Sequence, residues 1–173
     1  MLKVATAECF THGKVAAELH SFARGYPYQY PFTLVREEVD ISVVAGLFIP
    51  TISGVKAILR IEPLPPKAVM DDIKVYEQEQ DCRMAMRMAD AVMRLTEADI
   101  GIGTTAGIGN GAVAVVGMDK IYSRVPDVYA DLRSSDAELL QKREKAGVFT
   151  ALRLFEEFLS EGANPDEYEK YIK

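Results

Sequence analysis

Short apolar runs alternate along the chain with longer segments in which apolar residues recur every three or four positions. The short runs consist mainly of small and β-branched residues, as is typical of buried strands, and lie at residues 3–7, 41–49, 99–105, 111–118 and 120–125. The longer segments predict helices at residues 12–24, 53–59, 77–95, 136–159 and, as a short tail, 166–173. This alternation predicts a single α/β domain over residues 1–173, with a mostly parallel sheet flanked by helices.

The residues suited to catalysis or ligand binding are concentrated in two turns that follow predicted strands. One is the segment from Glu8 to Lys14, after the first strand, and the other is the glycine-rich segment 104–111. In open α/β sheets, ligands bind outside the carboxyl ends of the strands. We therefore expect Cys9 and the 104–111 segment to form two walls of one crevice.

The first turn places Cys9 between a strand end and a helix start, with Thr11 as the expected N-cap. Free amides at a helix N-terminus favour a thiolate, and the backbone from Thr11 to Gly13 offers donors for an oxyanion. His12 is a candidate base. The structural alternatives are that Cys9 is a small buried hydrophobe, that Glu8 is a cap and that His12 is solvated.

The second turn, GIGTTAGIGNG, contains five glycines and two threonines. Glycines let backbone amides approach an anion, and the hydroxyls of Thr104 and Thr105 can bind a phosphate or carboxylate. The spacing is not that of a P-loop. The alternative is a tight turn between two buried strands.

Three further features have weaker signals. Lys56 follows the second apolar strand, where it would either reach the thiol or lie on the surface. Cys82 lies on the apolar side of the Met-rich helix 77–95, which favours core packing. The methionines of that helix indicate either the core or an interface between subunits.

Composition excludes several classes of function. The net charge is −6 and no run of lysine and arginine is present, so a nucleic-acid partner is not expected. No apolar stretch reaches the roughly 20 residues that span a bilayer, and the N-terminus lacks the pattern of a signal peptide. Two cysteines and two histidines provide neither a disulfide framework nor a zinc site. We expect a cytoplasmic protein without a membrane partner.

Three segments resemble known families. ATAECFTHGKVAAELH is similar to the ATAES-CTGG signature of the C-terminal CinA domain, a nucleotide amidohydrolase in which a nucleophilic serine stands where this chain has Cys9. MADAVMRLTEADIGIGTTAGIGNG and YADLRSSDAELLQKREKAGVFTALRLFEEFL resemble two later CinA segments. The run ATAECFTHGK, together with GYP and GTTAGIG, resembles the archaeal HcgF family, which is linked to biosynthesis of the iron-guanylylpyridinol cofactor of a methanogen hydrogenase.

The HcgF resemblance implies that Cys9 accepts the adenylylated carboxyl group of guanylylpyridinol as a thioester. It implies guanylylpyridinol as a nucleotide-like ligand, no cofactor of the protein's own, and a partner enzyme that adenylylates the ligand. The expected catalytic residues are Cys9, His12 and Lys56. The expected substrate-binding residues are Glu8, Thr11, Gly13, Thr104, Thr105 and Gly107.

Kinship with CinA and the Met-rich helix also favour a homo-oligomer. Two other functions stay open: a CinA-like amidohydrolase of a nucleotide substrate, and a non-catalytic nucleotide-binding protein in which Cys9 is inert.

Overall fold

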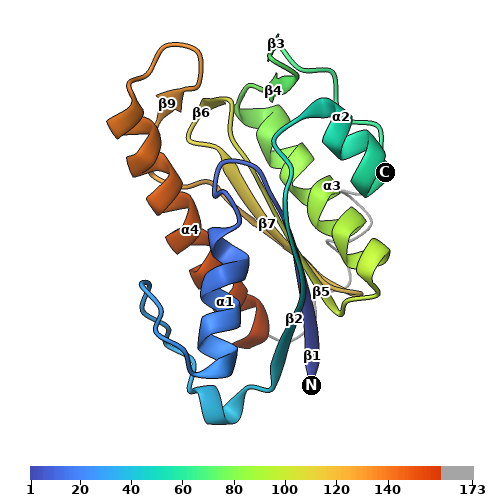
Figure 1. Cartoon of the computed structure of the whole chain (residues 1–173), viewed down its shortest axis with the longest axis vertical. Coiled ribbons are helices and arrows are strands. Elements are labelled where there is room, and N and C mark those ends of the chain that lie inside the picture. Colours follow the sequence, from blue (N-terminus) through green and yellow to red (C-terminus); the bar gives the residue numbers. More distant parts are fainter. Residues whose placement is uncertain (161–173) are drawn as a thin grey trace.

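The computed structural model describes residues 1–160 and contains a five-stranded central sheet with helices on both faces (Figure 1). The strand order is β2 (Ile41–Phe48), β1 (Leu2–Glu8), β5 (Ile100–Thr105), β7 (Ala112–Val116) and β8 (Ile121–Arg124). β1 pairs in parallel with both β2 and β5, whereas β7 pairs antiparallel with β5 and β8. The parallel strands are separated by crossover helices, whereas the connections from β5 to β7 and from β7 to β8 are too short for a crossover.

Helices α1 (Lys14–Arg24) and α4 (Ala137–Ser160) cover one face of the sheet (Figure 1). The core beneath them includes Val4, Leu19, Val115 and Phe155. Helix α3 (Gln78–Thr96) covers the other face, together with α2 (Ile52–Gly54) and the π-turn Val55–Leu59. Strands β5 and β7 are therefore buried on both faces, which explains their continuous runs of apolar and small residues.

Helix α3 packs unusually close to β5 because two strand residues lack side chains. A Cβ atom added at Gly101 would lie 2.0 Å from the carbonyl oxygen of Ala89, and one added at Gly103 would lie 2.0 Å from that of Ala85. Two of the five glycines of the GIGTTAGIGNG segment are thus required by packing rather than by a ligand.

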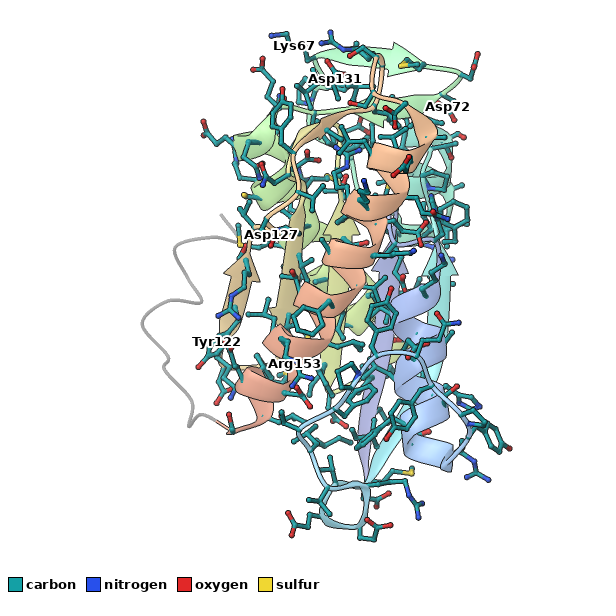
Figure 2. The ribbon with its side chains drawn as sticks, turned by 90° about the vertical axis from the view of Figure 1, so that its left-hand side faces the viewer. Lys67, Asp72, Tyr122, Asp127, Asp131 and Arg153 are labelled. Carbon is teal, nitrogen blue, oxygen red and sulfur yellow. The ribbon has the colours of Figure 1, made fainter. Side chains whose placement is uncertain are left out.

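Small elements gather at the carboxyl end of β1. β3 (Ala68–Met70) and β4 (Ile73–Val75) form a hairpin, and β6 (Ile108–Gly109) pairs with β9 (Ala130–Asp131). In Figure 2, Lys67, Asp72 and Asp131 mark this end of the molecule, and Tyr122 and Arg153 lie toward the opposite end. A short 3₁₀ turn, Arg36–Glu38, precedes β2. Within residues 1–160, no helix is both long and apolar enough to cross a membrane.

The predicted α/β class is confirmed, and each predicted strand and helix of the described region is present within a few residues of its expected bounds. Two details were wrong. Gly13, not Thr11, precedes the first helix, and no side chain at that position caps it. Part of the expected 104–111 turn forms β6. Of the two alternatives for the Met-rich helix, the structure shows core packing, because its methionines are buried within this chain: Met84, Met86, Met88 and Met93. The expected tail helix, 166–173, lies outside the described residues.

Candidate active site

The carboxylate of Glu8 organises the turn that carries Cys9. Its Oε1 accepts hydrogen bonds from the Thr6 hydroxyl at 2.8 Å and the Ala16 amide at 2.9 Å. Its Oε2 accepts from the Thr11 hydroxyl at 2.6 Å and the Val15 amide at 3.1 Å. The side chain is fully buried, so it supplies the acceptor that the first turn of α1 needs. The structure therefore places Glu8 and Thr11 beneath the turn and not in the lining of the cavity described below.

Residue Thr104 ties the Cys9 turn to β5. The Cys9 amide donates to the Thr104 carbonyl at 3.0 Å and lies 3.3 Å from its hydroxyl. The hydroxyls of Thr104 and Thr11 are 2.8 Å apart, and both side chains are fully buried. The ends of β1 and β5 are thus joined by a polar contact that leaves the thiol of Cys9 as the chemically reactive group of the turn.

Cys9 borders a cavity of about 220 Å³ at the carboxyl ends of β1, β2 and β5. Most of the wall is apolar and is formed by Phe10, Phe48, Pro50, Ile73, Leu132 and Leu140. Ala106 of the 104–111 segment also lines the cavity, so the structure brings the two predicted turns to one site. The polar lining residues are Cys9, His12 and Arg143.

His12 is held by a carboxylate from the far end of the chain. Its Nδ1 lies 2.9 Å from Oε2 of Glu144, and Lys14 donates to the other oxygen of the same carboxylate. This contact with Lys14 raises the pKa of the lysine. Because an ionised carboxylate only accepts hydrogen bonds, the neutral form of the imidazole has its proton on Nδ1 and leaves Nε2 as an acceptor. The imidazole therefore has the tautomer of a general base.

The backbone of the turn retains free donors. The amide of His12 donates to the Cys9 carbonyl at 3.3 Å, whereas the amides of Phe10, Thr11 and Gly13 have no hydrogen-bond partner within the described part of the chain. His12 and Gly13 have positive φ values of 54° and 80°. This left-handed pair turns the backbone sharply before α1 begins, so the amides of the turn are not used within the helix.

Beneath the cavity, Asp81 of α3 and the backbone of Gly107 form a buried contact. Oδ2 of Asp81 accepts from the Gly107 amide at 2.9 Å, and burial raises the pKa of Asp81 to about 6. Oδ1 of Asp81 and the hydroxyl of Thr105 are buried without a hydrogen-bond partner among residues 1–160. A Cβ atom at Gly107 would lie 2.3 Å from the Tyr76 amide nitrogen. Neither Thr105 nor Gly107 lines the cavity, and packing alone requires the glycine at position 107.

The structure does not bring Lys56 to this cavity. Its ammonium lies 2.7 Å from the carboxylate of Glu62, both side chains are largely exposed, and neither residue lines the cavity. The buried lysine near the site is Lys74, which donates to the carbonyls of Ile49 at 3.3 Å and Pro50 at 3.0 Å.

Arg143 and Glu144 are the important residues that the sequence analysis missed. Both lie on α4, more than 130 residues from Cys9, and both are buried. A signal was present in the sequence: Leu140, Arg143 and Gly147 recur at helical spacing, which places a charged residue on the buried stripe of the helix. In the described region, no group of three or more metal-ligating side chains is present.

The fold and the site define a CinA-like α/β domain with a cysteine at the carboxyl end of its first strand. The structure is similar to that of a CinA superfamily protein from Escherichia coli, with a TM-score of 0.56 and 18% identity over 91% of this chain and 80% of that one. It is also similar to competence damage-inducible protein A from Klebsiella pneumoniae, with a TM-score of 0.57 and 15% identity over 92% and 87% of the two chains. At these identities the similarity establishes the fold alone.

The chain belongs to the HcgF family. The family model described as "FeGP cofactor biosynthesis protein HcgF" matches residues 1–159. A UPF0254 protein from Methanocorpusculum labreanum is 67% identical over 99% of this chain and 100% of its own length. Another, from Methanothermobacter thermautotrophicus strain Delta H, is 52% identical over 92% and 99% of the two chains. Both the family resemblance and the CinA-like fold inferred from the sequence are confirmed.

Proposed function

We propose that this protein accepts the adenylylated carboxyl group of guanylylpyridinol on Cys9 as a thioester, within biosynthesis of the FeGP cofactor. The observation that carries the proposal is the position of Cys9, which borders an apolar cavity at the carboxyl ends of three strands. The family places the chain in FeGP cofactor biosynthesis. The thiol is the nucleophile that the cavity offers.

The proposed step is an acyl transfer. The sulfur of Cys9 attacks the acyl carbon, a carbon–sulfur bond forms, and the bond between that carbon and the phosphate oxygen of AMP breaks. The thiol proton passes to a base, and AMP leaves. The product thioester keeps the acyl group more reactive than a carboxylate, which suits a later transfer of the acyl carbon to iron.

Two features of the turn support this chemistry. His12 borders the same cavity and has its Nδ1 held by Glu144, so its Nε2 is available to take the thiol proton. The free amides of Thr11 and Gly13 lie two and four residues after Cys9 in the same turn and are suitable donors for the oxyanion of a tetrahedral intermediate. Thr104 contributes indirectly, because it fixes the position of the Cys9 amide.

The size of the cavity favours one ring of the ligand over the whole ligand. Pockets for drug-sized ligands measure roughly 300–1,000 Å³, and this cavity measures about 220 Å³. In our proposal the substituted pyridinol ring enters between Phe10 and Leu140, and the nucleotide part remains outside. The acyl adenylate has to be made by a separate adenylylating enzyme, which is the partner that this reaction requires.

Intact-protein mass spectrometry tests the proposal. The chain is incubated with adenylylated guanylylpyridinol, and Cys9→Ala and Cys82→Ala variants are treated in parallel. We expect a hydroxylamine-sensitive adduct with the natural chain and with Cys82→Ala, and none with Cys9→Ala. Cys82 is a matched control because it packs against the core cluster beneath α3 and does not line the cavity.

The opposite results are equally informative. Release of AMP with a free carboxylate, and no adduct at any time, would identify a hydrolase. Tight binding with neither an adduct nor turnover would leave Cys9 as part of a binding pocket and contradict the thioester.

A further inference from the structure

The guanidinium of Arg143 is hydrogen-bonded to the protein through one of its nitrogens, and its other two nitrogens have no hydrogen-bond partner in the described region. Its Nη1 donates toward the carbonyl oxygens of Gly107 at 3.0 Å, Gly109 at 3.0 Å and Ala130 at 2.8 Å. These carbonyls belong to the β6 and β9 segments, so the side chain also joins the two segments. Three acceptors on one nitrogen fix the plane of the group before any ligand arrives.

The opposite edge of the same guanidinium has no protein partner. Neither Nε nor Nη2 makes a hydrogen bond to any residue that the structure describes, although the side chain is 2% exposed. In the described region, two polar side-chain atoms are both inaccessible to solvent and without a hydrogen-bond partner, namely Asp81 Oδ1 and Thr105 Oγ1. Nε and Nη2 of Arg143 also lack a partner but are not among these inaccessible atoms. The free edge therefore faces accessible space, and the accessible space at Arg143 is the Cys9 cavity.

The charge on this edge is not balanced inside the cavity. None of the residues that line the cavity is Asp or Glu. The buried carboxylate below, Asp81, is hydrogen-bonded to the Gly107 amide and makes no ion pair with Arg143. Burial lowers the pKa of Arg143, and the charges of Asp81 and Asp131, which act in the opposite direction, do not offset this effect. The Phe10 ring, 5.9 Å from the guanidinium carbon, adds a weak attraction only.

We infer that the Nε–Nη2 edge of Arg143 is an anion-binding fork, which holds a carboxylate or phosphate oxygen of the ligand beside the Cys9 thiol. The two N–H groups on this edge are parallel and match the two oxygens of such an anion. The ligand of the cavity is therefore an apolar ring with an anionic group at its inner end. This inference deepens the proposed function, since it concerns the same site, but it makes no assumption about thioester formation.

Two thiol reagents that differ in one charged group test the inference. Cys9 is alkylated with iodoacetate or with iodoacetamide, and modification at Cys9 is quantified by peptide mass spectrometry. The ratio of the two rates is compared with the ratio for N-acetylcysteine. We expect the ratio at Cys9 to exceed that reference by about tenfold or more, because a hydrogen bond to a charged group contributes roughly 1.5–3 kcal/mol.

The variants separate the fork from the thiol. Arg143→Met should return the ratio to the reference, whereas Arg143→Lys should keep an intermediate value because the charge remains and the fork is lost. Any general change in thiol reactivity affects both reagents and cancels in the ratio. A ratio in the natural chain at or below the reference, or an unchanged ratio in Arg143→Met, would overturn the inference.

A second measurement needs no variant and no reactive thiol. Titration calorimetry compares benzoate with benzamide, which share the ring and differ in the anionic group. Preferential binding of benzoate supports the fork, and equal or stronger binding of benzamide contradicts it. If Cys9 reacts with neither alkylating reagent, the thioester proposal fails, and the calorimetry alone decides whether the anion site exists.

Discussion

Each residue at the Cys9 turn has a separable task. Glu8 and Thr104 determine where the turn lies, whereas Cys9 and His12 border the cavity. Glu144 touches His12 but does not line the cavity, so it is a positioning residue. This division predicts that substitutions of equal size at these positions have different effects.

His12 and Glu144 can be tested by their effect on thioester formation. We expect His12→Gln to slow the reaction by about 10²–10⁴-fold, the usual contribution of a general base. Glu144→Gln should slow it less, by about tenfold, since the imidazole remains but loses the acceptor that fixes its tautomer. The measurement is the rate of adduct formation as a function of pH. A purely structural effect would lower the rate without changing the shape of this pH profile.

A control for this pair lies on the same helix. Glu138 is exposed and pairs with Lys142 at 2.9 Å, so Glu138→Gln should react like the natural chain. Equal rates for the natural chain and His12→Gln at every pH would show that His12 is not the base.

Asp81 predicts a pH dependence of stability. Its pKa is raised to about 6 in the folded chain, so between about pH 4 and about pH 6 the folded state binds more protons than the unfolded state. The stability associated with the neutral carboxyl is present below this window and is lost as the pH rises through it, by about 3 kcal/mol. The free energy of unfolding, measured by urea denaturation at about pH 4 and about pH 8, should therefore lack this loss in Asp81→Asn.

The control for Asp81 is Asp127→Asn, an exposed carboxylate on the surface (Figure 2). This variant should keep the pH dependence of the natural chain. If Asp81→Asn follows the natural chain at both pH values, the Asp81 carboxyl is not protonated in the folded state.

At the scale of elements, the close approach of helices to the sheet decides which glycines are irreplaceable. Helix α3 meets β5 through backbone atoms at Gly101 and Gly103, whereas α1 meets β2 through a side chain, the Cβ of Ala16, which lies 2.4 Å from a Cβ built at Gly46. The two contacts should therefore respond differently to a compensating substitution.

Gly103→Ala should destabilise the chain by about 1–3 kcal/mol or more, because α3 has to move away from β5. Adding Ala85→Gly should not restore stability, since the clash is with the carbonyl oxygen of Ala85 and not with its side chain. Gly46→Ala should also destabilise, but adding Ala16→Gly should recover part of that loss. Chemical denaturation of the four variants checks this, and rescue of Gly103→Ala by Ala85→Gly would contradict it.

On the scale of the whole molecule, the burial of each layer predicts which segments unfold locally first. Every residue of β5 and β7 is buried, whereas the β3–β4 hairpin exposes Val69 and Met70. Hydrogen exchange measured by mass spectrometry should be slowest in β1, β5 and β7 and much faster in the hairpin. Comparable protection in β3 and β5 would show that the hairpin is part of the stable core.

The local sequence pattern was sufficient to predict much of the secondary structure and the fold class of this protein. Strand and helix types, the α/β class and the cysteine at a strand end all follow from hydrophobic periodicity and turn residues, because such features depend on neighbours within a few positions. The family resemblance around Cys9 also needs only a contiguous run of residues. The bounds differ by a few residues, as expected where capping decides the end of a helix.

Tertiary structure decided which residues share the cavity. Arg143 and Glu144 reach the Cys9 turn because α4 crosses the sheet beside α1, and Lys56 is excluded because its turn faces outward and pairs with Glu62. Two glycines of the segment predicted to bind an anion, Gly101 and Gly103, instead allow α3 to pack closely against β5. Sequence spacing carries no information on contacts between residues more than 100 positions apart, because these depend on how layers pack and not on local propensity.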